Sequence, residues 1–173
     1  MVEKAQYEIV KKIIDIEIRK YPEMILAVVE GYKGDSGFNL LFNYITGNNK
    51  TKNKIPMTAP VITSEKIPMT APVITKNKYM AFVLPSYYNK KTVPTPINTE
   101  VKIKIQKEKT YAVLRFRGRT SNNRVQQHIE KLIQILKNNN IKMKDDTILM
   151  RYNSPFAPGF IRRNEVAIEI DNY

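Results

Sequence analysis

The chain of 173 residues has no cysteine and a single histidine, His128. The lack of cysteine excludes disulfides, thiolate metal sites and cysteine nucleophiles. One histidine excludes a multi-histidine metal centre, and a histidine-dependent catalytic triad would have to use His128. No run of about 18 apolar residues is present, so we expect no transmembrane helix. Residues 1–12 lack the apolar stretch of a signal peptide, and we therefore expect a cytoplasmic protein.

The residues that are present suit one globular domain with an anionic ligand. Hydrophobic residues make up 42% and charged residues 26% of the chain, which is typical of a domain that buries its own core. Lysine and arginine number 29 against 16 acidic residues, a net charge of +13. This excess favours an anionic ligand or partner. The basic residues are spread over both halves and form no tail, so we do not expect nucleic acid to be the partner.

A ten-residue segment occurs twice in identical form. Lys-Ile-Pro-Met-Thr-Ala-Pro-Val-Ile-Thr spans residues 54–63 and again residues 66–75. Proline cannot donate a hydrogen bond to a central ladder of a sheet. Each copy is therefore predicted to form an edge strand, and the two copies to form a hairpin that turns at residues 64–66.

A second, weaker repeat divides the chain into halves at about residues 7–90 and 98–171. In each half, an alternating segment is followed by a segment that contains Ala-Val and ends in glycine, and then by a helical segment. The paired segments are 16–21 with 25–31, and 101–106 with 111–118. Alternation with period two is typical of half-buried antiparallel strands. The sequence therefore predicts two strand–strand–helix–strand units in a single α+β domain over residues 1–173.

Both predicted helices are amphipathic. The first spans about residues 36–45, and its predicted core face consists of Phe38, Leu41, Phe42 and Ile45. On its other side, Leu40 and Tyr44 are either isolated surface residues or part of a ligand surface. The second spans about residues 124–136, and its predicted core face consists of Val125, Ile129, Leu132 and Leu136. His128 lies beside this face, where a boundary side chain is more typical than a metal ligand.

Motifs of known catalytic sites are absent. The chain has no glycine-rich phosphate loop, no His-Glu-x-x-His segment and no Gly-x-Ser-x-Gly segment. The residues alone therefore indicate a binding domain without a catalytic constellation.

Three segments, in this order, resemble the SOUL haem-binding protein family. They are Lys-Ile-Pro-Met-Thr-Ala-Pro-Val at 54–61, Tyr-Met-Ala-Phe-Val-Leu-Pro at 79–85 and Arg-Asn-Glu-Val at 163–166. The resemblance covers about residues 7–170, and the chain looks most like short prokaryotic or archaeal members. It implies a distorted antiparallel β-barrel flanked by two helices, with two pseudo-symmetric β-β-α-β halves, an architecture shared with GyrI-like domains. It also implies non-catalytic, reversible binding of haem or another tetrapyrrole, as a carrier or buffer, by a monomer.

The resemblance implies a position for the ligand. In the family it lies in an apolar groove beside the first helix and the loop that precedes the Arg-Asn-Glu-Val strand. In this chain the groove residues would be Leu40, Leu41, Tyr44, Met57, Phe156 and Phe160. The haem propionates would be met by Lys54, Arg162 and Arg163.

Two positions differ from some relatives. Lys20 stands where those relatives have a histidine that is proposed as an axial ligand, and residues 156–158 stand where some have a lysine. We therefore expect haem to bind without an obligatory histidine ligand, with His128 as a weak candidate for axial ligation and no other metal ligand.

Two other functions remain open from the sequence. An enzyme acting on a tetrapyrrole or a hydrophobic anion would need a buried carboxylate with a raised pKa, for which Glu30 and Glu165 are the candidates. A basic module that binds protein or nucleic acid would lose affinity as salt rises. Glu165 itself is predicted to be structural and to pair with a neighbouring basic residue.

Overall fold

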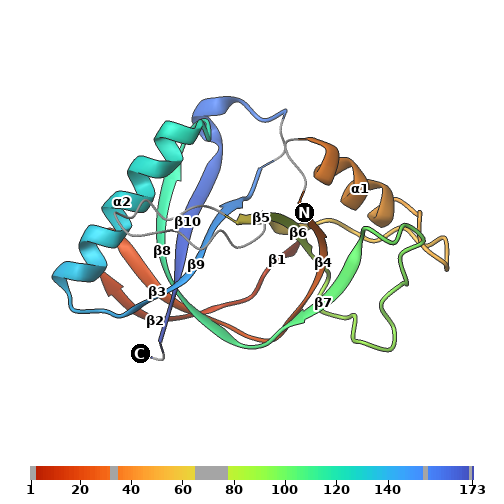
Figure 1. The fold of residues 1–173 in the computed structure, drawn as a ribbon, viewed down its shortest axis with the longest axis horizontal. Helices are drawn as coiled ribbons and strands as arrows, with labels where there is room; N and C mark the ends of the chain where they lie inside the picture. Colours follow the sequence, from red (N-terminus) through yellow and green to blue (C-terminus); the bar gives the residue numbers. More distant parts are fainter. Residues whose placement is uncertain (1–2, 32–34, 65–77, 154–155, 172) are drawn as a thin grey trace.

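A computed structural model describes residues 3–31, 35–64, 78–153, 156–171 and 173. Within these residues, ten strands form one sheet that carries two α-helices and a short 3-10 helix (Figure 1). The strands of the first half are β1 (Glu3–Lys4), β2 (Glu8–Ile13), β3 (Ile16–Tyr21), β4 (Met24–Glu30), β5 (Thr58–Ser64) and β6 (Tyr79–Val83). Those of the second half are β7 (Lys102–Gln106), β8 (Lys109–Arg117), β9 (Met143–Arg151) and β10 (Arg163–Ile170). The helices are α1 (Asp35–Ile45), α2 (Asn122–Asn138) and η1 (Gly159–Ile161).

The order of the strands reveals the internal symmetry. The sheet runs β2-β3-β8-β10-β9-β5-β6-β4-β7, and every pair in it is antiparallel, while β1 adds to β5 in parallel. Each half forms a three-strand group, β4-β6-β5 or β8-β10-β9, and the groups meet where β5 pairs with β9. The alternating strands β3 and β7 are exchanged between the halves, because β3 pairs with β8 and β7 pairs with β4. The predicted duplicated α+β fold is thus confirmed.

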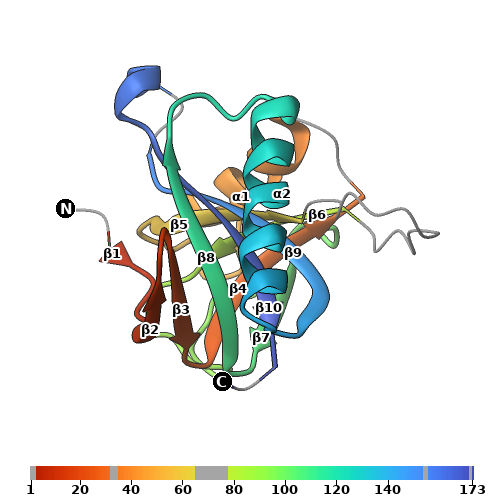
Figure 2. The ribbon, with the colours of Figure 1, turned by 90° about the vertical axis from the view of Figure 1, so that its left-hand side faces the viewer.

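The sheet is curved but not closed into a barrel. In the described part of the chain, β2 at one end pairs only with β3, and β7 at the other end pairs only with β4. Helix α2 packs on β8 and β10, and α1 packs on β4 and β6, at opposite ends of the molecule (Figure 1). Figure 2 views the molecule from the α2 end. The expected barrel is therefore an open, curved sheet with a helix over each half.

The core lies on both faces of the sheet, and successive side chains of β4 point alternately into one side and the other. Ala27 and Val29 pack under α1, whereas Leu26 and Val28 belong to a cluster on the opposite face. That opposite cluster joins both halves, because it also contains Val113 of β8 and other strand residues of the second half. Under α2, all four predicted core residues are buried: Val125, Ile129, Leu132 and Leu136.

The predicted core face of α1 is partly wrong. Leu41 and Ile45 are buried as expected, but Phe42 is 45% exposed. Tyr44, predicted on the polar side, is only 1% exposed, and its hydroxyl donates to the carbonyl of Pro94 at 2.7 Å. The reason is that the segment after β6 folds back over this side of the helix, where Tyr88 joins the same apolar cluster.

The first copy of the ten-residue repeat is not an edge strand. It contributes β5, which lies between β6 and β9. Pro60 is accommodated because the register with β6 shifts between Thr58 and Val61, and pairing with β9 begins only at Val61. The second copy and the predicted hairpin turn lie outside the described residues.

Equivalent glycines end β4 and β8. Gly31 and Gly118 have φ angles of +78° and +114°, a region that favours glycine. The Gly31 N–H donates to the carbonyl of Lys78 at 2.7 Å, and the Gly118 N–H donates to that of Arg162 at 3.1 Å. The second of these bonds ties the end of β8 to the loop before β10, which belongs to the predicted ligand site.

Candidate functional site

The α1 side of the predicted groove is only partly accessible. Leu41 and Tyr44 lie in the core between α1 and the sheet, with exposed fractions of 0% and 1%. Their assignment as groove-lining residues is therefore corrected: they support α1 from behind. Leu40 and Met57 are half-buried at the margin of the same cluster, where part of each side chain remains accessible. Lys54 is exposed on the segment that leads into β5.

The loop before β10 presents aromatic side chains to solvent. Phe156 is 96% exposed and Phe160 is 78% exposed. The base of the loop is fixed, because Arg162 Nε donates to the carbonyl of Ala157 at 2.8 Å and the Arg163 N–H donates to Asn153 Oδ1 at 2.7 Å. Two phenylalanines exposed on a loop with a fixed base form an apolar surface that a ligand can cover.

Arg163 has a different role from the predicted one. Its guanidinium contacts Glu165, with Nη2 at 2.6 Å from Oε1, and lies 4.3 Å from the centre of the Tyr152 ring. Arg19 of β3 binds the same carboxylate through Nη1, 2.7 Å from Oε2, and the Tyr152 hydroxyl donates to it at 2.9 Å. These contacts engage the charge of Arg163 within the fold, while its side chain remains 20% exposed.

The same cluster confirms that Glu165 forms an ion pair. Glu165 is fully buried, and Arg19 is 3% exposed. Burial alone would raise the pKa of Glu165, but the hydrogen bonds and charge of Arg19, followed by those of Arg163, outweigh it and lower the pKa. The hydrogen bond and charge of Lys104 likewise lower the pKa of Glu30. Neither glutamate is therefore the raised-pKa carboxylate that the enzyme alternative required.

His128 belongs to α2, which lies at the opposite end of the molecule from α1 (Figure 1). Its ring stacks on Phe116 with centres 4.1 Å apart. Its Nδ1 lies 2.7 Å from the carbonyl oxygen of Arg124 and donates to it, since a carbonyl can only accept. These contacts are those of a boundary side chain.

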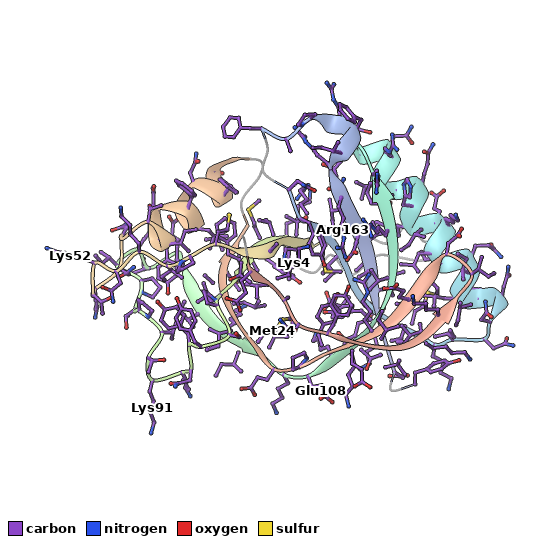
Figure 3. All side chains as sticks on the ribbon, turned by 180° about the vertical axis from the view of Figure 1, so that it is seen from behind. Lys4, Met24, Lys52, Lys91, Glu108 and Arg163 are labelled. Atoms are coloured by element: carbon purple, nitrogen blue, oxygen red, sulfur yellow. The ribbon has the colours of Figure 1, made fainter. Side chains whose placement is uncertain are left out.

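Lys20 is also remote from α1. Its ammonium pairs with Glu108 at 2.9 Å, and Figure 3 places Glu108 at the opposite edge of the molecule from α1. A histidine at this position of β3 would not reach the predicted groove. In the described residues, no group of three or more histidine, aspartate or glutamate side chains is placed to hold a metal ion.

Sequence reasoning missed a pocket on another face of the molecule. It has a volume of about 670 Å³ and lies between the N-terminal segment, the β3–β4 turn and the segment after β6 (Figure 3). Contacts that hold the N-terminal segment in place include the pairing of β1 with β5, a hydrogen bond that Glu3 Oε1 accepts from the Ser86 hydroxyl at 2.9 Å, and one that the Ala5 N–H donates to the Ala59 carbonyl at 2.8 Å. The three walls are distant in sequence, and although Leu84 and Pro85 belong to the family segment at 79–85, no local signal brings the walls together.

Solved structures share this fold at low sequence identity. The C-terminal domain of EcmrR has 11% identity and a TM-score of 0.64, over 96% of this chain and 99% of that one. A hydrolase from Listeria innocua has 10% identity and a TM-score of 0.59, over 91% and 92%. An uncharacterized conserved protein from Listeria innocua has 11% identity and a TM-score of 0.56, over 98% and 94%. At these identities the likeness establishes the fold alone.

Sequence comparison identifies the family. A search of curated proteins gives no match. In the described residues, no helix has the length and apolar character needed to cross a membrane. The sequence model described as SOUL heme-binding protein matches residues 2–169, nearly the whole chain. The chain therefore belongs to the SOUL haem-binding protein family.

Proposed function

We propose that this protein binds haem or a related tetrapyrrole without turning it over, as a carrier or buffer. The observation that carries the proposal is the family match over residues 2–169. The proposed site is the surface between the accessible margin of α1 and the loop before β10. We also propose that the protein acts as a monomer in the cytoplasm, and sedimentation velocity tests the first of these two statements.

The side chains near this surface suit a flat, apolar dianion. A bound haem supplies a planar ring, two carboxylates and an iron atom. Leu40 and Met57 would contact the ring from the α1 side, and Phe156 and Phe160 would cover it from the loop. Lys54, which is exposed, and Arg162, at the base of the loop, would be the cations that meet the propionates. Charge-assisted hydrogen bonds of this kind are shorter and stronger than neutral ones.

The loop aromatics can supply a useful part of the binding free energy. A phenylalanine buries roughly 150–250 Å² when fully covered. If a ring covers about half of each exposed side chain, the two phenylalanines contribute about 5 kcal/mol in gross terms at about 25 cal/mol per Å². Micromolar affinity needs about 8 kcal/mol after the costs of association. The loop is therefore expected to be necessary and the remaining contacts to supply the rest.

A haemin titration of variants tests the location. We expect Phe156→Ala/Phe160→Ala to weaken haemin binding at least tenfold, since it removes about half of the apolar contact. Tyr173→Ala, which removes another exposed aromatic ring, is the matched control and should bind as wild type does. His128→Ala should keep both the affinity and the Soret spectrum. A loss of the Soret shift in His128→Ala, with normal binding by the loop variant, would place the ligand at α2 instead.

A further inference from the structure

We propose that the pocket between the N-terminal segment, the β3–β4 turn and the segment after β6 is a second binding site, for an amphipathic organic anion. None of the nine residues predicted to meet the tetrapyrrole lines it. The proposal goes beyond tetrapyrrole binding and does not depend on it. The pocket volume of about 670 Å³ lies within the range of roughly 300–1,000 Å³ that small-molecule sites occupy.

The floor of the pocket is apolar. It is lined by residues of β4, β6 and β7, by Leu84 directly after β6, and by two prolines. These residues are Pro22, Met24, Ile25, Val83, Leu84, Pro85 and Ile105. Ile105 lies on the terminal strand β7 and remains 40% exposed, while Met24 and Ile25 are half-buried. Val83 and Leu84 are already buried, so an apolar ligand would remove mainly the exposed parts of Met24, Ile25 and Ile105 from water, which is the main favourable term in binding a hydrophobic body.

The rim of the pocket favours a negative charge. Three exposed lysines line it: Lys4, Lys90 and Lys91. Of the two lining carboxylates, that of Glu3 already accepts hydrogen bonds from the Ser86 N–H at 3.1 Å and from its hydroxyl at 2.9 Å. Glu23 is the other. An anionic head group therefore meets three cations against one carboxylate that is not bound to Ser86.

The backbone that carries two of these lysines is ordered by its own side chains. Asn89 Oδ1 accepts from the Lys91 N–H at 2.8 Å and from the Thr92 N–H at 3.1 Å. The Thr92 hydroxyl in turn accepts from the Asn89 N–H at 3.0 Å. Because this turn is fixed before any ligand arrives, less conformational entropy is lost when the ligand binds. Figure 3 shows Lys4, Met24 and Lys91 on the same face of the molecule.

An apolar floor with a cationic rim selects a two-part ligand. Inorganic phosphate would gain nothing from the floor, and a neutral hydrocarbon would gain nothing from the lysines. The class that uses both is a hydrophobic ring system with one carboxylate or sulfonate. A suitable probe is 8-anilinonaphthalene-1-sulfonate, and N-phenyl-1-naphthylamine is its matched control, because it has the same aromatic body without the sulfonate.

The experiment measures fluorescence of both probes against wild type and three variants. Lys90→Gln/Lys91→Gln should weaken the sulfonate probe about fivefold, as expected for two exposed charge contacts, and should leave the neutral probe within twofold. Lys107→Gln/Lys142→Gln removes the same charge from exposed lysines outside the pocket and should change neither affinity. Phe156→Ala/Phe160→Ala should also bind the sulfonate probe normally.

Several outcomes would overturn the proposal. If both lysine double variants bind the sulfonate probe equally more weakly, the effect is one of general charge. If neither variant changes the affinity for the sulfonate probe, the lysines of the rim do not bind the anion. Displacement of the probe by one equivalent of haemin, together with weaker haemin binding by Lys90→Gln/Lys91→Gln, would make this pocket the tetrapyrrole site and not a second one. If haemin does not bind at all while the probe results hold, the proposed function fails and the second site stands.

Discussion

Replacing Glu165 with glutamine removes the charge at the centre of a buried cluster. The carboxylate is fully buried and lies 2.7 Å from Arg19, which is itself 3% exposed. Removing one partner of a buried pair costs about 3–5 kcal/mol, because the other charge is left uncompensated. Arg19 keeps a second contact, with its Nε 2.8 Å from Glu17 Oε2, so we expect Glu165→Gln to cost about 3 kcal/mol, near the lower end of that range.

Urea denaturation measures this loss. With a slope of about 2 kcal/mol per M, a loss of about 3 kcal/mol lowers the midpoint by about 1.5 M. Glu17→Gln is the matched control, because it removes the other carboxylate from the same arginine. The Glu17 side chain is 28% exposed, and its loss should cost about 1 kcal/mol or less. Equal midpoints for Glu165→Gln and Glu17→Gln would refute the reasoning that burial decides the cost.

The same variant predicts a dependence on pH. The folded-state pKa of Glu165 is lowered, so its contribution to stability is present above the unfolded-state pKa of about 4.3 and is lost as the pH falls through the folded value. The difference in unfolding free energy between wild type and Glu165→Gln should therefore be constant near neutrality and narrow below about pH 4. A constant difference down to the acid transition would contradict the ion-pair account.

Two further predictions concern backbone and tyrosines. Gly118→Ala should lower the free energy of unfolding in urea by about 2–3 kcal/mol, because φ is +114° and a Cβ would lie 3.1 Å from the Arg124 guanidinium. Gly31→Ala should lower it by about 1 kcal/mol, because φ is +78° and a Cβ would have no other atom within 4 Å. Equal losses in the two variants would contradict this difference. Burial raises the pKa of Tyr21 to about 12 and also raises that of Tyr111, above the unfolded-state value of about 10. The contribution of these tyrosines to the free energy of unfolding is therefore fully present below about pH 10 and should be lost as the pH rises through about 12. Absorbance at 295 nm should then show tyrosines that ionise only on unfolding, and titration of all ten near pH 10 in folded protein would disprove it.

Helix α2 could be predicted well because the periodicity of its apolar residues alone determines which face is buried. A single apolar stripe faces the sheet, and its four predicted core residues are all buried. Helix α1 was harder, because two neighbours cover it: the sheet on one side and the segment after β6 on the other. The periodicity of apolar residues identifies the face of α1 that packs on the sheet, but not the face that the segment after β6 covers. The partner of the Tyr44 hydroxyl is a backbone carbonyl 50 residues away, which no local pattern indicates.

The repeat predicted two similar halves but not how they combine. Residues 16–21 and 101–106 were correctly predicted as strands, and they form β3 and β7, yet each pairs with a strand of the other half, and β1 and β2 precede β3 without having been predicted. Nothing in an alternating segment specifies which strand it joins. Pro60 likewise suggested an edge, and only the register shift beside it explains a central β5.

The burial of the predicted site residues differs from one residue to the next. The family motif Arg163-Asn164-Glu165 marks a conspicuous feature of the fold, but its role here is internal: Arg163 and Glu165 pair, and the Asn164 side chain donates to the carbonyl of Gly118 at 2.8 Å. Phe156 and Phe160 were named as ligand contacts and are exposed, whereas Leu41 and Tyr44 are not. Burial depends on packing between distant segments, and sequence patterns report it poorly where three elements meet.

The measurement that tests the central claim most directly is the titration of purified protein with haemin, followed in the Soret band. The account predicts a saturable spectral change with one equivalent of haemin and a dissociation constant in the micromolar range. It also predicts that His128→Ala gives the same curve, since that ring is stacked on Phe116 and its Nδ1 donates to the carbonyl of Arg124. Absence of a saturable change at tens of micromolar haemin would contradict tetrapyrrole binding by this chain.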